Sequence, residues 1–104
     1  MRYSYDVPAG FIIGAALSKK SGKINITDLI TIKTSIHANA PRYYVSFSRD
    51  SLCSEIEANS DCFVYENDQI RLNDFYMDNI WRIKRYFYDV LDEDLRNAID
   101  LALA

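Results

Sequence analysis

The sequence predicts a single α+β domain, built from helices around a small β-hairpin. Three observations predict this class. Residues 48–59 have the apolar spacing of a helix and lead directly into a two-stranded hairpin at 63–72. Helical patterns precede and follow this stretch, at 8–20 and 73–104. A chain of 104 residues with 49% hydrophobic residues can bury one core without disulfide bonds.

The first expected helix begins near Pro8, because a missing N–H costs nothing in the first turn of a helix. Gly22 lies beyond its end and suits a helix stop. Gly10 and Gly14 lie four residues apart on one side, where we expect the close approach of another backbone. The apolar face of this helix consists of Phe11, Ile12, Ala15 and Ala16.

Residues 24–36 fit two patterns. The isoleucines alternate as in a strand, whereas Ile26, Leu29 and Ile30 also form a helical face with Thr27 as a plausible N-cap. We favour a short strand at 23–26 and then a helix to about His37, with a long hairpin strand as the alternative. The sequence Asn-Ala-Pro at 39–41 would end the helix. The aromatic stretch that follows, at 43–47, fits a short strand or a helical turn.

The next helix is expected to begin after Ser48, a good N-cap, and to end at the Asn-Ser-Asp of 59–61. Its inner face would be Leu52, Ile56 and Cys53. In the hairpin that follows, Phe63 and Tyr65 on one arm meet Ile70 and Leu72 on the other, around residues 66–69. Asn and Asp suit this turn because they tolerate left-handed backbone.

A long final helix is expected from Asn73 or Asp74 to about residue 90. Its apolar seam is Tyr76, Ile80, Ile83, Phe87 and Val90. A second stripe, about 100° around the helix, consists of Met77, Trp81, Lys84 and Tyr88. It is either a dimer interface, since Trp and Tyr are frequent hot spots, or a broad core face covered by a helix at 92–104. That last helix would open at the acids of 92–94.

The order helix, short strand, helix, capped helix and hairpin resembles the winged helix-turn-helix fold. The resemblance covers about residues 8–72, with residues 73–104 as a C-terminal helical extension. It implies macromolecular binding, commonly with the third helix in the DNA major groove and the hairpin as a wing. The connection at 38–47 is longer than the tight turn usual in this fold. If this docking mode applies to the present chain, the residues that face the DNA groove would be Arg49, Asp50, Ser54, Glu55, Glu57 and Asn59.

The charges along this helix and hairpin oppose the usual DNA contact, because affinity for DNA rises with each phosphate that a basic side chain neutralises. We therefore predict an acidic face that binds a partner protein, made by Asp50, Glu55, Glu57, Glu66 and Asp68. The leading hypothesis is a non-enzymatic regulatory or inhibitory protein that acts by protein–protein contact. The alternative is a winged-helix DNA-binding transcriptional regulator.

Charge is divided unevenly along the chain. Residues 1–49 carry seven basic and two acidic residues, and residues 50–104 carry five basic and thirteen acidic residues. Either the molecule has one basic and one acidic region, or the fold interleaves the two halves. The basic side chains form a candidate patch for nucleic acid or an acidic partner, or else a solvated loop. This patch consists of Lys19, Lys20, Lys23, Lys33 and Arg42.

Candidate chemistry is sparse. His37, the single histidine, fits a nucleophile dyad with Cys53 or a zinc site with both cysteines, but the nine-residue gap from Cys53 to Cys62 is not finger spacing. We expect no enzyme activity, cofactor or metal, and free thiols at both cysteines. The apolar run at 11–17 is too short to span a bilayer, and two cysteines do not form a disulfide framework. We expect a cytoplasmic protein without a membrane partner.

Overall fold

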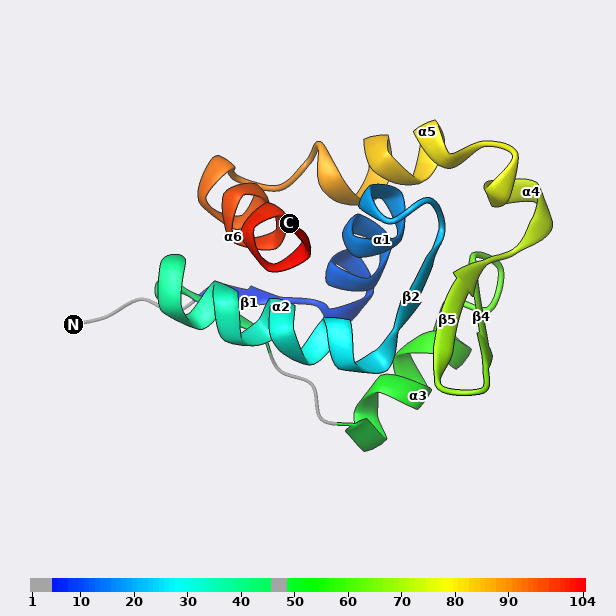
Figure 1. Ribbon diagram of the computed structural model, residues 1–104, viewed down its shortest axis with the longest axis horizontal. Helices are drawn as coiled ribbons and strands as arrows, with labels where there is room; N and C mark the ends of the chain where they lie inside the picture. The colour runs from blue at the N-terminus through cyan, green and yellow to red at the C-terminus, as the bar shows by residue number, and fades with distance from the viewer. Residues whose placement is uncertain (1–4, 46–48) are drawn as a thin grey trace.

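The computed structural model of the chain describes residues 5–45 and 49–104 and has an α+β architecture (Figure 1). The first half contains β1 (Tyr5–Val7), α1 (Ala9–Lys19), β2 (Lys23–Asn25), α2 (Ile26–Asn39) and β3 (Tyr43–Val45). The second half contains α3 (Arg49–Ala58), β4 (Phe63–Glu66), β5 (Gln69–Leu72), α4 (Asp74–Met77), α5 (Ile80–Ile83), the π-helix η1 (Lys84–Tyr88) and α6 (Glu93–Leu103).

The predicted hairpin is confirmed, and it belongs to a three-stranded antiparallel sheet of order β2-β5-β4. Phe63 lies opposite Leu72 across the hairpin, and Ile24 of β2 lies opposite Ile70. Asn67 and Asp68 form the turn with φ angles of 51° and 62°, the left-handed backbone of a type I′ turn. The sequence pattern did not predict the second sheet, in which β1 and β3 pair in parallel.

The ambiguity of residues 24–36 is resolved in favour of a short strand followed by a helix, and the long hairpin strand is wrong. The helix α2 begins at Ile26, and its N-cap is Asn25 instead of Thr27. The backbone N–H of Asn25 donates to the Asp28 carboxylate at 3.2 Å, which is half of a capping box. This local hydrogen bond fixes the point at which the strand ends and the helix begins.

The helix α3 forms as expected, with Leu52 and Ile56 buried. The proposed cap Ser48 lies outside the described residues, as does Phe47. The side chain of Cys53, expected on the inner face, also lies outside the described part of the structure.

The helix α1 runs from Ala9 to Lys19, with Pro8 at its N-cap position. Gly22 follows it with φ of 85°, which confirms the stop. The close approach expected at Gly14 exists, but it involves a side chain instead of a backbone. A Cβ atom on Gly14 would lie 2.3 Å from Cγ of Phe87, so η1 packs directly on this face of α1.

The prediction of one long helix from residue 74 to 90 is wrong, because the segment breaks into α4, α5 and η1. Asn73 caps α4 as expected, accepting a hydrogen bond from the Tyr76 N–H at 3.0 Å. Asn79 leaves the helical region, with φ of −134° and ψ of 46°, and its side chain donates to the Phe75 carbonyl at 2.8 Å. A polar side chain that bonds to the nearby backbone competes with helix continuation.

The π-helical turn changes the direction of side chains after Lys84, whose carbonyl accepts from the Asp89 N–H at 2.9 Å. Of the predicted seam, Ile83 is buried, whereas Val90 is 61% exposed. Tyr76, Ile80 and Phe87 are half-buried and pack against the core. The seam therefore docks this segment everywhere except at its C-terminal end.

The helix α6 lies across α2 and α1, where its apolar face closes the core (Figure 1). Leu95, Ala98 and Ile99 of α6 are buried, as the pattern predicted, and Asp92 is the N-cap residue. One hydrophobic cluster joins this helix to the elements of residues 8–72. The C-terminal segment is thus part of the same core. Within residues 5–45 and 49–104, no helix has both the length and the apolar character needed to cross a bilayer.

Candidate functional site

The acidic side chains predicted to bind a partner lie on two neighbouring elements, α3 and the β4–β5 hairpin. Glu57 on α3 is exposed and Glu55 is half-buried, while Glu66 and Asp68 are exposed at the hairpin tip. The side chain of Asp50 lies outside the described part of the structure. The helix and the hairpin pack on each other. Of these acids only Glu57 lines the hollow between them, whereas the Glu55 carboxylate lies toward Gly10 of α1.

A hollow of about 490 Å³ lies between α3 and β4. Its floor is formed by Ile56 and Phe63, which are 5% and 2% exposed. Tyr65 and Val64 form the hairpin side, and Glu57 stands on the α3 side. We call this feature the α3–β4 groove. It combines an apolar floor with an acidic edge, which suits a basic partner segment that inserts an apolar side chain.

The acids at the hairpin tip are partly satisfied within the chain. Arg71 lies 3.8 Å from Glu66 and 3.7 Å from Asp74, and the Tyr65 hydroxyl donates to Asp68 at 2.9 Å. Glu57, in contrast, forms no ion pair within the described residues. Within the described residues, the carboxylate at the edge of the groove is therefore available to an incoming cation.

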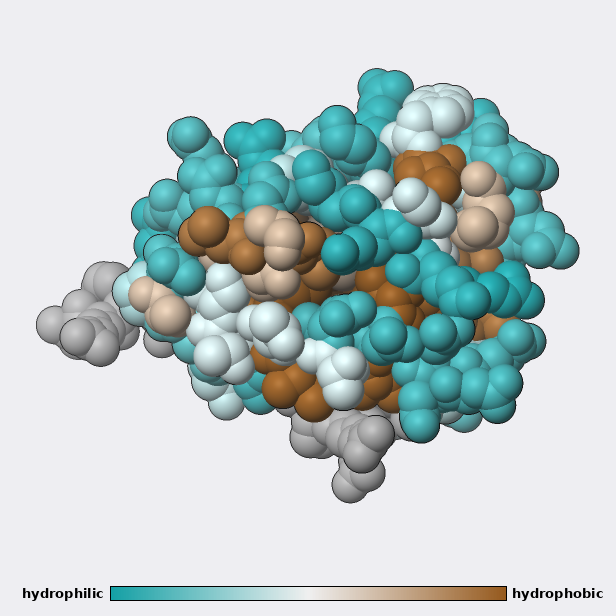
Figure 2. Space-filling model, in the orientation of Figure 1, coloured by the Kyte–Doolittle hydropathy of each residue, from teal (hydrophilic) through white to brown (hydrophobic). Residues whose placement is uncertain are grey.

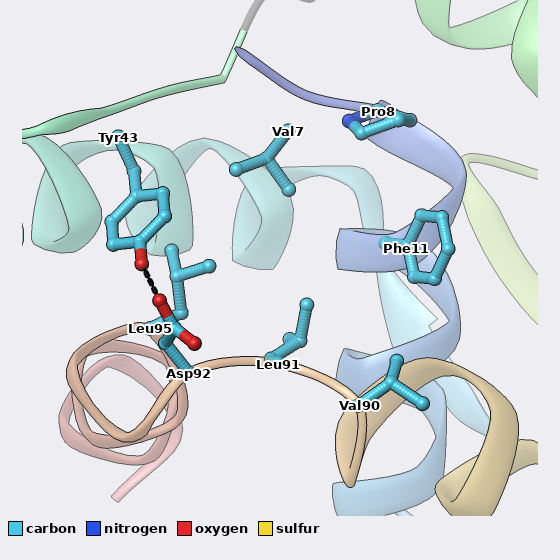
Figure 3. Close-up of a pocket in the computed structure, with 8 residues that line it drawn as sticks. All are labelled: Val7, Pro8, Phe11, Tyr43, Val90, Leu91, Asp92 and Leu95. Atoms are coloured by element: carbon cyan, nitrogen blue, oxygen red, sulfur yellow. Dashed lines mark hydrogen bonds between the residues drawn. The ribbon is translucent and has the colours of Figure 1, made fainter. Parts of the chain in front are cut away.

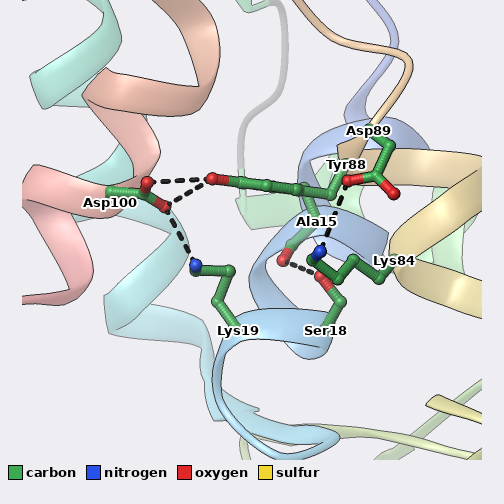
Figure 4. A network of polar contacts seen from close by, with 7 residues as sticks. All are labelled: Ala15, Ser18, Lys19, Lys84, Tyr88, Asp89 and Asp100. Carbon is green, nitrogen blue, oxygen red and sulfur yellow. Dashed lines mark hydrogen bonds and ion pairs between the residues drawn. The ribbon is translucent and has the colours of Figure 1, made fainter. Parts of the chain in front are cut away.

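The predicted basic patch does not form one surface of free cations. The ammonium group of Lys19 lies 3.6 Å from Asp100 and 4.9 Å from the centre of the Tyr88 ring (Figure 4). Arg42 lies 3.5 Å from Asp92 and 3.4 Å from Asp94. These contacts join basic residues of the first half to acids of the second half, so the fold interleaves the charges along the chain.

Among the other predicted basic residues, Lys20 and Lys23 are exposed near the loop after α1, whereas Lys33 is half-buried on α2. The loop thus offers two exposed cations at most beside the neutralised Lys19. Such a small group supplies little of the charge neutralisation on which DNA affinity depends.

The second stripe predicted on the final helix is divided by the break in that helix. Met77 packs over the loop after α1, because a Cβ atom on Gly22 would lie 2.4 Å from its sulfur. Tyr88 is buried, with its hydroxyl donating to Asp100 at 2.8 Å (Figure 4). Trp81 remains 56% exposed, and the exposed Lys84 lies 3.6 Å from Asp89. Two members of the stripe therefore serve the internal packing of the chain.

Burial of Tyr88 and the adjacent Asp100 carboxylate raise the pKa of Tyr88 to about 12. Both causes disfavour the phenolate, because it would lose hydration and face a second negative charge. Tyr88 thus remains a hydrogen-bond donor that connects η1 to α6, as Figure 4 shows.

The described cysteine and the histidine take part in separate local contacts. Cys62 is half-buried, and burial raises the pKa of its thiol, while a hydrogen bond with Tyr76 acts in the opposite direction. The His37 ring stacks on Tyr44 with centroids 5.8 Å apart. In the part of the chain that the structure describes, no three His, Cys, Asp or Glu side chains are grouped to hold a metal ion.

A second hollow, of about 350 Å³, lies where β1 and α1 meet the segment before α6 (Figure 3). Its walls are apolar, with Phe11 and Leu95 among them. The hydroxyl of Tyr43 donates to Asp92, and Asp92 also pairs with Arg42. These polar groups already bond to one another, and most of the remaining lining is apolar. The hollow therefore has few polar groups left to recognise a ligand.

A third hollow, of about 420 Å³, runs between α2 and α6 and has no charged residue in its lining. Ile30 and Leu101 at this site are 50% and 63% exposed. Figure 2 shows apolar side chains gathered over these two helices on the face toward the viewer. The absence of charge from the lining leaves this surface without a feature that specifies a partner.

Comparison with protein-family models, with curated proteins and with solved structures gave no match.

Proposed function

We propose that this protein is a non-enzymatic regulatory or inhibitory protein that binds a partner protein through the α3–β4 groove and its acidic surroundings. The observation that carries the proposal is the apolar floor of Ile56 and Phe63 beside Glu57, which forms no ion pair within the described residues. An apolar centre with a charged edge is the usual organisation of a protein interface.

The proposal includes a winged-helix-like arrangement. The element order α1-β2-α2-α3-β4-β5 and the strand order β2-β5-β4 support it. In this arrangement α3 is the third helix and the β4–β5 hairpin is the wing. The strand β3, paired with β1, occupies the connection between α2 and α3, which gives a reason for the length of residues 38–47.

The charges favour a basic protein segment over DNA as the occupant. Glu55, Glu57 and the hairpin acids would repel the phosphates that a third helix normally approaches. A partner that carries Lys or Arg beside a large apolar side chain would satisfy Glu57 and fill the groove at the same time. DNA binding through Lys20 and Lys23 remains the alternative function.

Site-specific photo-cross-linking in the native cell tests the proposal. We expect a cross-linkable amino acid in place of Val64, which lines the groove, to form an adduct with a protein. The same substitution at the exposed Lys20 is the matched probe for the alternative. Adding Glu57→Lys to the Val64 variant should remove the adduct, because it reverses the charge at the edge of the groove.

Two results would contradict the proposal: an adduct at position 64 that persists with Glu57→Lys, or a nucleic acid adduct at position 20 alone. Binding to a mixed-sequence DNA duplex across a salt series gives an independent measurement. Tight binding that weakens steeply with salt would support the DNA-binding alternative and exclude protein contact as the primary activity.

A further inference from the structure

The C-terminal end of α3 differs in charge from the ends of the other long helices. The carbonyl end of a helix carries a partial negative charge, which a basic side chain in the last turn can offset. The last turns of α1 and α2 contain Lys19 and His37, and in α6 the acid of the last turn, Asp100, pairs with Lys19. The last turn of α3, a helix of 10 residues, contains Glu55 and Glu57 and no basic residue.

Neutral groups, and not cations, bond to the carbonyls at this end of α3. The N–H of Asn59 donates to the carbonyls of Glu55 and Ile56 at 3.2 Å each, and the N–H of Ser60 donates to the Glu57 carbonyl at 3.2 Å. Among the ion pairs of residues 5–45 and 49–104, none includes Glu55 or Glu57. In the described part of the chain, α3 therefore ends in negative charge that a cation from outside would stabilise. A local departure of this kind from the usual pattern is expected at a functional site.

This end of α3 opens onto the α3–β4 groove, because the chain turns there from the helix into the hairpin (Figure 1). Glu57 and Ser60 line the groove on its α3 side, and Ile56 and Phe63 form its apolar floor. Glu55 lies toward α1, so Glu57 is the carboxylate of the last turn that faces the groove. A ligand in the groove thus meets an apolar surface and the negative helix end together.

We propose that Glu57 and the C-terminal end of α3 form a cation subsite of the α3–β4 groove, which receives the ammonium or guanidinium group of a lysine or arginine of the partner protein. The inference rests on the proposed function and adds the position and the chemistry of the bound group. The cation forms charge-assisted hydrogen bonds with the Glu57 carboxylate, while an apolar group next to it lies on Ile56 and Phe63.

The acids of the hairpin tip do not form a second subsite of this kind. Glu66 lies 3.8 Å from Arg71, and Asp68 accepts a hydrogen bond from the Tyr65 hydroxyl at 2.9 Å. A cation at the tip would compete with these internal contacts, whereas a cation at Glu57 would not. Glu66 is therefore a matched control carboxylate, exposed like Glu57 but already paired.

NMR titration of the full chain with three small probes tests the subsite. Phenethylamine, phenethylguanidine and phenethyl alcohol share an apolar ring, and they carry an ammonium, a guanidinium and a neutral hydroxyl group. We expect the methyl signals of Ile56 and Val64, which line the groove, to shift with dissociation constants on the order of millimolar. The better of the two cations should bind at least about fivefold more tightly than the alcohol, and its identity assigns the subsite to lysine or to arginine.

Two variants separate the carboxylate from the helix end. Glu57→Gln should remove most of the preference for the cation and leave alcohol binding unchanged, whereas Glu66→Gln should change neither. Ala58→Lys places a cation in the last turn of α3, at an exposed position. Relative to Ala58→Gln, it should raise the urea midpoint of unfolding and weaken cation binding by about threefold or more, because it offsets the negative helix end. Circular dichroism checks that each variant is folded.

Equal binding of the three probes would overturn the cation subsite, as would the absence of any shift at about 20 mM probe. A cation preference that survives Glu57→Gln, or one that is lost with Glu66→Gln, would also overturn it. These failures differ from a failure of the proposed function. Probes that bind without a preference for the cation remove the subsite alone, whereas the absence of a protein adduct at position 64 in the cell removes the proposed function even if the probes bind.

Discussion

Tyr88 shows how one buried hydroxyl determines the role of its neighbours. Its O–H donates to the Asp100 carboxylate, at 2.8 Å from one oxygen and 3.0 Å from the other, while Lys19 pairs with the same carboxylate. The hydroxyl, the carboxylate and the ammonium group thus join η1, α6 and the end of α1 at one point (Figure 4). A side chain that resembles an interface residue in the sequence serves here as an internal connection.

This contact predicts a pH dependence of stability. The pKa of Tyr88 is raised from 10 to about 12 in the folded chain, so between these values the folded state binds more protons than the unfolded state. The free energy of unfolding should therefore fall as the pH rises from about 10 to about 12. We expect Tyr88→Phe to lack this contribution, because it has no proton to lose.

Urea unfolding of the wild-type chain and of Tyr88→Phe in that pH range measures the effect. The stability difference between the two proteins isolates Tyr88 from the lysines and the other tyrosines, which titrate in both. As the pH rises, the free energy of unfolding of the wild-type chain should fall relative to that of Tyr88→Phe. A difference that stays constant would contradict the assignment.

At the scale of elements, the packing of η1 on α1 depends on the absence of a side chain at Gly14. Phe87 occupies the space of the missing Cβ, and its ring also meets the rings of Phe11 and Phe63, with centroids 5.6 and 5.8 Å away. Gly10, one turn earlier, faces the side chain of Asn59 at a Cβ distance of 3.3 Å. The two glycines therefore differ in how much space surrounds them.

This difference predicts that α1 tolerates alanine at position 10 but not at position 14. Gly14→Ala should lower the free energy of unfolding by about 1–3 kcal/mol, because its methyl group would displace Phe87 from a packed core. Gly10→Ala is the matched control, and should change stability by less than about 1 kcal/mol, since the gain in helix propensity offsets a small shift of Asn59. Urea unfolding compares the two. Equal stability of the variants would show that Phe87 does not require Gly14.

At the scale of the whole molecule, α6 completes the core instead of extending it. Its residues Leu95, Ala98 and Ile99 are buried against α2 and α1, and Ser35 of α2 donates to the Ala98 carbonyl at 2.7 Å. The ion pairs of Lys19 and Arg42 with acids near or within α6 add contacts across the same boundary. Surface pairs of this kind contribute at most about 1 kcal/mol each, so the buried side chains carry most of the stability.

A truncation tests this role of α6. A chain that ends at residue 90 should lose cooperative thermal unfolding, because it exposes the apolar faces of α1 and α2. A chain that ends at residue 100 keeps the three buried side chains and should still unfold in one cooperative transition. Circular dichroism and calorimetry follow both. Cooperative unfolding of the shorter chain would show that residues 8–72 form a core of their own.

Local chemistry was sufficient to predict several elements. Apolar spacing located α1, α3 and α6, and the Asn67–Asp68 pair located the hairpin turn. The break at Asn79 was not predicted, because the apolar spacing of 76–90 continues through it. Nor was the pairing of β1 with β3, since three-residue strands that are distant in sequence leave no periodic signal.

The residues of the candidate sites likewise divide into those whose exposure the sequence predicted and those whose pairing it did not. The acids at Glu57, Glu66 and Asp68 are exposed where the pattern placed them, because a polar side chain on a helix face or at a turn reaches solvent in most folds. The neutralisation of Lys19 and Arg42 could not be predicted, because their acidic partners lie about 50 or more residues away in the chain.

The sequence by itself determined α1, α3, α6 and the hairpin, the Asn73 cap and the sign of the charge on α3 and the hairpin, because these depend on residues a few positions apart. Tertiary structure decided which charges remain free and which face of the 74–88 segment is exposed. Both depend on the helix break at Asn79, the π-helical turn and the docking of α6. Packing between distant elements sets these features, and no short-range pattern encodes it.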